Sequence, residues 1–428
     1  MLKLHIENIL DREEKIMAEW MKTSLIDIVD LVGGGTPKTS KAEYWGGNIN
    51  WLSVKDFNNE KRYVYSTEKT ITEEGLNNSS TKLLKKDDII ISARGTVGEL
   101  AMIPFPMAFN QSCYGIRAKE GTDSTFLYYL IKNSVRMFKA MTHGSVFDTI
   151  TRDTFANIEV VIPDIEMQHR IAKILADIDD KIENNERIND NLEEQAQALF
   201  KSWFVDFEPF NGTMPSDWEI VPLEKIADFQ NGYAFKSKEL LNEPSSDCYQ
   251  VFKQGHIARG GGFIPDGTKS WYPKKLASKL EKFVLKKGDI LMAMTDMKDN
   301  VAILGNTAIM PLDNEYIVNQ RVGHLRANGY KGVTYPFIYL LTNSTDFLVD
   351  LRSRANSGVQ VNLSSSEIKA SQTVLPSEEV NNAFSEITLP MFEIIINNQL
   401  ENQRLAQLRD TLLPKLMSSE LDVSNIEL

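Results

Sequence analysis

Apolar side chains recur at alternating steps of four and three residues from Ile171 to Trp203. The positions between them are mostly polar or charged, which is the heptad pattern of a long helix that packs against another helix. Pro163 and Asp164 provide a helix breaker followed by a capping side chain. The pattern predicts one helix within residues 164–208, about 60 Å long if about 40 residues are helical.

The same seam returns 213 residues later, within residues 377–428. Asn185 and Asn189 of the first seam correspond to Asn398 and Asn402 of the second. An asparagine buried in a heptad seam lowers stability but fixes register and partner choice, because only one alignment lets the amides pair. We therefore predict that the two helices pair with each other and that these four asparagines set their register.

Two mixed segments, residues 25–163 and 209–376, lie next to the predicted helices. In the first, Trp45 to Asn48 is interpreted as a turn, Asp88 to Ser92 as a short buried strand, and Phe126 to Phe138 as a helix. Such short strands and helices are typical of an α+β domain. Residues 1–24 are predicted to form a helical segment leading into the first domain.

The second mixed segment repeats landmarks of the first. Leu84 to Ile89 returns at Leu285 to Ile290, and Asn110-Gln111 returns at Asn319-Gln320. The offset between corresponding residues of the two segments grows from 198 at their N-terminal ends to 213 at their C-terminal ends. The core elements are therefore repeated, whereas the loops differ in length. A dipeptide shared by otherwise divergent copies is more consistent with holding the fold than with reading a ligand. The repeat predicts two domains of one fold with a pseudo-twofold relation.

Charge divides along the same boundaries. The net charge of −12 is concentrated in residues 164–208 (−7) and 377–428 (−6), while residues 25–163 are neutral and 209–376 carry +2. The domains can therefore present a positive surface to phosphate while the helices face solvent or protein. Only two cysteines occur, which favours a reducing compartment. With no apolar run of membrane-spanning length, we expect a cytoplasmic protein.

Motifs for catalysis are absent from the sequence. There is no G-x-x-x-x-G-K-[ST] loop, no H-E-x-x-H helix and no Asn-Pro-Pro-Tyr, and the five histidines lack ligand spacing. Asp266, Glu281 and Lys282 do not form a convincing metal-dependent nuclease site. We expect neither a catalytic nor a metal site on this chain, so any catalysis belongs to a partner.

Loop side chains that can donate to phosphates or base edges remain as candidates for DNA binding. In the first domain they are Lys38, Thr39, Ser40, Lys41, Lys55, Arg94, Gln111, His143 and Arg152. In the second they are Lys236, Lys253, His256, Arg259, Lys298, Arg321, Arg352 and Arg354.

The chain resembles the specificity subunit of type I restriction-modification enzymes over essentially its whole length. The resemblance rests on QHRIAKILADIDDKIENNERINDNLEEQAQALFKSWFVDF, GGGTPKTSKAEYWGGNINWLSVKDF, DDIIISARGTVGELA, NQSCYGI and IVNQRVGHL. It implies two target-recognition domains, residues 25–163 and 209–376, separated by conserved long helices that form an antiparallel coiled coil. Each domain would read one half of a split, asymmetric double-stranded DNA site, and the helix pair would set the gap.

The resemblance also implies partners. Two modification subunits would bind S-adenosylmethionine, methylate adenine N6 and dock on the helices, and two restriction subunits would use ATP and Mg²⁺. Three alternatives remain open at this point: a two-headed protein that binds something other than DNA, a self-contained enzyme with an unrecognised site, and a specificity subunit of a methylation-only system.

Overall fold

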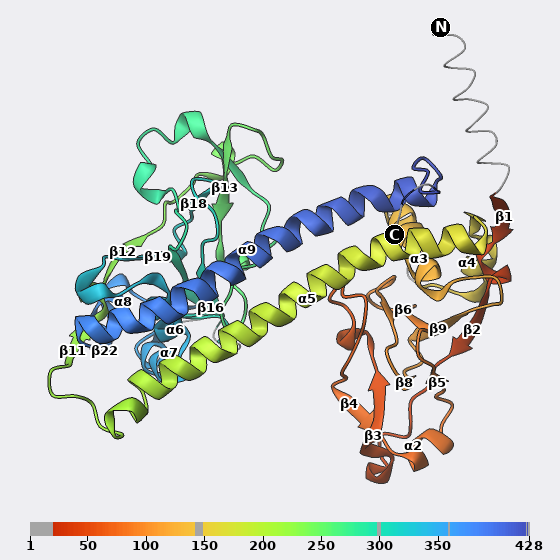
Figure 1. The fold of residues 1–428 in the computed structure, drawn as a ribbon, viewed down its shortest axis with the longest axis horizontal. Coiled ribbons are helices and arrows are strands. Elements are labelled where there is room, and N and C mark those ends of the chain that lie inside the picture. Colours follow the sequence, from red (N-terminus) through yellow and green to blue (C-terminus); the bar gives the residue numbers. More distant parts are fainter. Residues whose placement is uncertain (1–19, 142–148, 298–300, 358–359, 425, 427–428) are drawn as a thin grey trace, which may run out of the picture. The chain divides into compact units, whose positions relative to one another are not determined.

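The computed structural model describes residues 20–141, 149–297, 301–357, 360–424 and 426. The chain divides into two compact units, residues 1–184 with 401–428, and residues 185–400. Two 40-residue helices, α5 (Ile165–Phe204) and α9 (Glu378–Met417), each continue from one unit into the other (Figure 1). Each unit therefore combines one globular domain with a part of both long helices.

The described residues of the first unit form short strands and three α-helices besides the long ones. Its strands are β1 (Met21–Ser24), β2 (Val29–Gly33), β3 (Trp45–Leu52), β4 (Lys69–Ile71), β5 (Leu83–Leu84), β6 (Ile89–Ser92), β7 (Leu100–Met102), β8 (Met107–Phe109), β9 (Cys113–Ala118) and β10 (Glu159–Ile162). Its helices are α2 (Glu73–Asn77), α3 (Ser124–Met141) and α4 (Arg152–Asn157). The sheets have the orders β2-β9-β6-β7, β4-β3-β8-β5 and β1-β10.

The second unit repeats this plan with additions. Its strands are β11 (Glu219–Pro222), β12 (Ala227–Asn231), β13 (Cys248–Phe252), β14 (Trp271–Pro273), β15 (Ile290–Ala293), β16 (Thr295–Met297), β17 (Thr307–Ile309), β18 (Tyr316–Val318), β19 (Val322–Ala327), β20 (Asn356–Ser357), β21 (Gln360–Asn362) and β22 (Gln372–Leu375). Its helices are α6 (Tyr335–Asn343), α7 (Thr345–Ser353) and α8 (Ser365–Ala370). The sheets have the orders β12-β19-β15-β17, β14-β13-β18, β11-β22 and β16-β21-β20.

Matching strand orders confirm the predicted α+β repeat. The sheet β2-β9-β6-β7 corresponds to β12-β19-β15-β17, and the parallel pair β3–β8 corresponds to the parallel pair β13–β18. The sheet β16-β21-β20 has no counterpart among the described residues of the first unit. These added strands lie among the extra residues of the second domain, which the growing offset between the two copies had indicated.

The heptad seam is the contact surface of the long helices. All seam positions from Ile171 to Trp203 and from Phe384 to Leu416 are buried or half-buried. Within the first unit the helices run antiparallel, since the Asn402 amide donates to the carbonyl of Ile182 over 3.3 Å while Asp179 contacts Arg409. Within each unit, seam side chains are part of the domain core, because they belong to the same apolar cluster as α3 in the first unit and as α6 in the second.

An asparagine pair bridges the helices inside the second unit. The Nδ2 of Asn398 donates to Oδ1 of Asn189 over 2.9 Å, and Asn185 is fully buried. An amide pair of this kind is possible in one alignment of the helices only. Amide pairing across the seam is therefore observed, and its control of register stays a prediction.

The repeated motif around Asp88 and Asp289 builds the same turn in both domains. The Asp88 carboxylate accepts from the backbone N–H of Lys85 over 2.7 Å, and the Asp289 carboxylate accepts from that of Lys286 over 2.7 Å. An arginine also donates two hydrogen bonds to each carboxylate: Arg117 to Asp88 in the first domain, and Arg326 to Asp289 in the second. The motif recurs because it ties a tight turn to a neighbouring strand.

The repeated Asn-Gln dipeptide also has a structural role. The side chain of Asn110 accepts from the backbone N–H of Ser112, and that of Asn319 accepts from the backbone N–H of Arg321. A Cβ on Gly34 would lie 2.1 Å from the Asn110 carbonyl oxygen, and the same holds for Gly232 and Asn319. Only glycine permits this approach, which explains why the glycine recurs, and the side-chain hydrogen bond explains why the asparagine recurs.

Two predictions about local structure are wrong. Residues 21–24 form strand β1, which pairs with β10, so the segment 1–24 is not helical at that end; residues 1–19 lie outside the described residues. Trp45 to Asn48 belongs to strand β3 rather than to a turn, with a register shift between Trp45 and Ile49. Gly46, at φ +79°, provides the bulge that sequence reasoning interpreted as a turn.

Candidate nucleic-acid interface

Several loops of the first domain converge on an open cleft of about 420 Å³. The loop after β3 contributes Lys55, the approach to β4 contributes Glu68 and Lys69, the β6–β7 turn contributes Arg94, and the loop after β8 contributes Asn110. Lys55 and Arg94 were predicted as DNA-binding residues, and the fold brings them to one site. The cleft therefore collects residues that are up to 61 positions apart in sequence, from Trp51 to Ser112.

The charged side chains of the cleft are exposed, and positive charge is in excess. Lys55, Lys69 and Arg94 give three positive charges, and Glu68 gives one negative charge. Among the residues that the structure describes, the charged ends of Lys55, Glu68 and Arg94 have no ion-pair partner, and Lys69 Nζ lies 6.0 Å from the Trp45 ring centroid. The exposed donors of Lys55 and Arg94, which form no ion pair, suit contacts to phosphates and base edges.

Buried groups hold the cleft in shape. Trp51 donates its Nε1–H to the carbonyl of Gly35 over 3.0 Å, and its ring meets Trp45 edge to face at 5.1 Å. The Asp56 carboxylate accepts from the backbone N–H of Ser53 and from that of Glu68. The lining loops are thus fixed by hydrogen bonds before any ligand arrives.

The remaining candidates of the first domain lie outside the lining of this cleft. Lys38, Thr39, Ser40 and Lys41 are exposed in the loop before β3, and Lys41 lies over the Tyr44 ring at 4.9 Å. The Gln111 side chain accepts a hydrogen bond from the Thr36 hydroxyl. Arg152 on α4 donates to the Leu31 carbonyl, and His143 falls outside the described residues.

The corresponding edge of the second domain has different chemistry. Lys253 follows β13 where Ser53 follows β3, and Arg321 follows Asn319 where Ser112 follows Asn110. The side chains of Gln254 and Thr295 hydrogen-bond each other over 2.8 Å. At matching positions the first domain has Val54 and Arg94. Two copies of one fold therefore offer different donors at the same edge.

His256 supports the second domain from inside. Its side chain is fully buried, stacks on Phe252 at 5.0 Å, and accepts at Nδ1 from the backbone N–H of Lys253 over 3.1 Å. Asp56 has the same capping role at the matching turn of the first domain. A side chain in this position caps a turn and does not face a ligand, so burial argues against the predicted DNA contact.

The burial of His256 leads to a pH prediction. Burial lowers the pKa of His256 below its usual value of 6.5, although the Lys253 backbone partly opposes this. As pH falls below about 6.5 the unfolded histidine binds a proton that the folded one resists, so stability falls by up to about 1.4 kcal/mol per pH unit. His256→Asn keeps an acceptor without titrating. Urea unfolding at pH 7.5 and 5.5 should show a smaller stability loss in this variant; an equal loss contradicts the prediction.

Of the other candidate DNA-binding residues of the second domain, some are exposed and others make contacts within the fold. Lys236, Arg259 and Arg321 are exposed, and Lys298 lies outside the described residues. Arg352 donates to the Leu304 carbonyl over 2.8 Å, and Arg354 pairs with Asp350 on the same helix over 2.6 Å. Their guanidinium groups are committed to the fold in this structure.

Sequence reasoning missed Glu68 and Lys69. Glu68 lies in the loop before β4, and Lys69 is the first residue of that strand. Neither belongs to a motif or to a repeated landmark of the sequence, and the pairing of Trp51 with Lys69 across β3 and β4 brings them to the cleft. A single sequence gives no signal for that pairing, because a strand of three residues with a bulged partner has almost no pattern.

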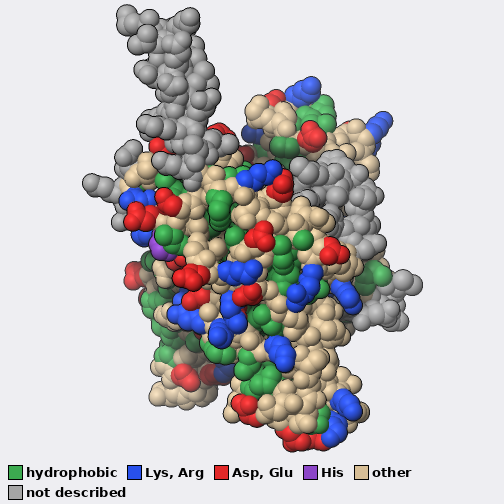
Figure 2. All heavy atoms as spheres, turned by 90° about the vertical axis from the view of Figure 1, so that its right-hand side faces the viewer, with side chains coloured by type: hydrophobic (Ala, Val, Ile, Leu, Met, Phe, Trp, Pro, Cys, Tyr) green, Lys and Arg blue, Asp and Glu red, His purple; other side chains and the backbone are tan. Residues whose placement is uncertain are grey.

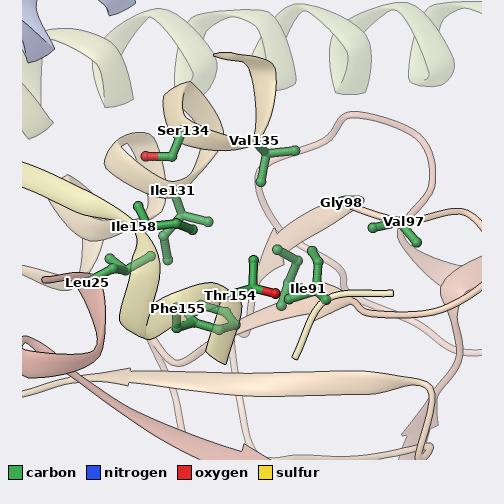
Figure 3. Close-up of a pocket in the computed structure, with 11 residues that line it drawn as sticks. Leu25, Ile91, Val97, Gly98, Ile131, Ser134, Val135, Thr154, Phe155 and Ile158 are labelled. Atoms are coloured by element: carbon green, nitrogen blue, oxygen red, sulfur yellow. The ribbon is translucent and has the colours of Figure 1, made fainter. Parts of the chain in front are cut away.

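The first unit also contains a small apolar cavity of about 50 Å³ (Figure 3). Leu25, Ile91 and Phe155 contribute to its lining, and the Ser134 hydroxyl donates to the Leu130 carbonyl. A space of this size without charged groups is a packing void. Across the described ranges, no group of three or more His, Cys, Asp or Glu side chains is placed to hold a metal ion. None of the described helices is long and apolar enough to cross a membrane.

Charges of both signs are mixed over one face of the molecule. The face drawn in Figure 2 shows Lys and Arg side chains interspersed with Asp and Glu rather than a continuous basic area. On this face, attraction to a polyanion depends on small groups of charges that lie close together, because exposed charges further apart than about 8–10 Å are largely screened at physiological salt.

Comparisons with known proteins agree with this geometry. A family model described as "Type I restriction modification DNA specificity domain" matches residues 17–194 and 215–409. The chain is 29% identical to the MjaIX specificity subunit of Methanocaldococcus jannaschii, with 96% of each chain covered. It is 26% identical to the HindI specificity subunit of Haemophilus influenzae, covering 69% of this chain and 76% of that one.

A solved structure shares the fold. The S subunit of a type I restriction-modification system from M. genitalium matches with a TM-score of 0.58 at 18% identity, covering 95% of this chain and 97% of that one. The family model matches both copies of the repeat, which is the domain arrangement that the sequence predicted. The chain therefore belongs to the family of type I restriction-modification DNA specificity subunits.

Proposed function

We propose that each globular domain reads one half of a split, asymmetric DNA site and that the long helices set the unread gap. The proposal rests on one observation: the two domains share a fold but have different hydrogen-bond donors at the corresponding edge. The donors are Lys55 and Arg94 in the first domain, and Lys253 and Arg321 in the second. Two similar readers with different contacts select two different sequences. As a specificity subunit, the chain supplies DNA sequence recognition, while catalytic activities sit on other subunits.

The proposed partners follow the charge distribution. Residues 164–208 and 377–428 carry the acidic excess and form the long helices, which suits contact with protein better than contact with phosphate. We place two adenine-N6 modification subunits, with S-adenosylmethionine, against these helices. Two restriction subunits, with ATP and Mg²⁺, complete the assembly in this proposal.

Sequencing of adenine methylation in cells tests the proposal. Cells that express the modification subunit encoded with this chain should acquire a new split motif only when the chain is present. Exchange of residues 25–163 for those of another specificity subunit should change one half of the motif and leave the other half intact. Absence of any motif that depends on this chain contradicts the proposal, and retention of both halves after the exchange contradicts the assignment of one half to each domain.

A further inference from the structure

Glu68 is the one carboxylate that lines the basic cleft of the first domain in the described structure. Its backbone N–H donates to Asp56 Oδ1 over 2.8 Å, and it directly precedes Lys69, which pairs with Trp51 across two strands. The backbone of Glu68 is thereby fixed at the end of a sheet, whereas its carboxylate is exposed and forms no ion pair with Lys55, Lys69 or Arg94. A pre-positioned carboxylate without a partner is available to a ligand.

Chemistry limits what this carboxylate can accept in a DNA complex. It repels phosphates and the acceptor atoms of bases, and it accepts hydrogen bonds from exocyclic amines in the major groove. Those amines are N4 of cytosine and N6 of adenine. The cations around Glu68 attract the DNA backbone to the cleft. Their attraction offsets the repulsion between the Glu68 carboxylate and the phosphates, so the carboxylate can approach an amine of a base.

We propose that Glu68 is a specificity-determining residue of the first half-site, accepting from the exocyclic amine of a cytosine or an adenine. This inference rests on the proposed function and deepens it. Lys55 and Arg94 then position the duplex and can donate to guanine or phosphate beside that base. The first half-site must therefore contain one position at which an amino base is required because of Glu68.

The test compares Glu68→Gln with Glu73→Gln in the full chain assembled with its modification subunits. Glu73 is an exposed carboxylate of the same domain on α2 that does not line the cleft, so both variants remove one negative charge. Methylation sequencing should show that Glu68→Gln loses discrimination at one position of one half-site, by about 5- to 150-fold. The other half-site should stay intact, which also shows that the assembly folds, and Glu73→Gln should match the parent.

The identity of the relaxed position distinguishes cytosine from adenine. Two results overturn the inference: an unchanged motif in Glu68→Gln, or a uniform rise in modification at all sequences with a changed salt dependence, which is the mark of a carboxylate facing phosphate. Either result leaves the split motif of the parent chain in place. Failure of the proposed function instead removes that motif from the parent itself.

Discussion

Replacement of Arg409 by alanine is expected to lower the free energy of unfolding of the first unit by about 3–5 kcal/mol. Arg409 Nη1 donates to Asp179 Oδ1 over 2.7 Å in the seam between α5 and α9, and both side chains are less than one-tenth exposed. Burial would lower the pKa of Arg409, but the Asp179 carboxylate outweighs burial and raises it. Alanine therefore leaves the Asp179 carboxylate buried, with Tyr129, whose hydroxyl donates to it over 2.6 Å, as its remaining hydrogen-bond partner among the described side chains.

The repeat supplies the compensating variant. At an offset of 213 residues, Asp179 corresponds to Phe392 and Arg409 corresponds to Ala196, and both of these are buried in the second unit. The double variant Asp179→Phe with Arg409→Ala should recover most of the lost stability, because a buried ion pair is often replaced by apolar side chains without loss. A double variant as unstable as Arg409→Ala would contradict this explanation.

Urea unfolding monitored by intrinsic fluorescence measures the effect, with an exposed ion pair as the control. Lys181 and Glu401 form a contact of 3.3 Å between the same helices, with 48% and 45% of the side chains exposed. Lys181→Ala should cost less than about 1 kcal/mol, since exposed pairs contribute little. Equal losses in Lys181→Ala and Arg409→Ala would show that burial does not determine the cost.

The long helices could be predicted from sequence because the heptad pattern is local, and the repeat could be predicted because the same landmarks occur twice. Heptad spacing places α5 within four residues of its observed end at Phe204, and shared landmarks identify two copies of one fold. The ion pair between Asp179 and Arg409 was not predicted, because a charged residue such as Asp179, one step off the apolar stripe, looks like part of the solvated face.

The candidate site was harder to predict, because its residues are far apart in sequence and only the fold brings them together. Lys55 and Arg94 were identified as donors, but nothing local indicates that Glu68 joins them or that His256 points inward. Glycines at 46 and 47 were interpreted as a turn, although Gly46 bulges a strand and Gly47 permits the close approach of Ile71. Such errors arise where backbone geometry depends on a strand distant in sequence.

Insertion of four residues into each long helix is expected to widen the unread gap of the DNA site by about one or two base pairs. Four helical residues add about 6 Å, and one base pair occupies about 3.4 Å. The insertions belong between Glu186 and Arg187 of α5 and between Gln399 and Leu400 of α9, which are equivalent at the offset of 213 residues. Both points lie beside the Asn189–Asn398 pair, so the antiparallel contacts on either side can be kept.

Methylation sequencing reads the gap directly, since both half-sites stay unchanged while their separation grows. A seven-residue insertion at the same points preserves the heptad phase and should widen the gap by about three base pairs, because it adds about 10 Å. Insertion into α5 alone puts its seam out of step with α9 and should abolish modification. An unchanged gap in the paired insertions would show that the helices do not set the spacing, even if each domain reads its own half-site.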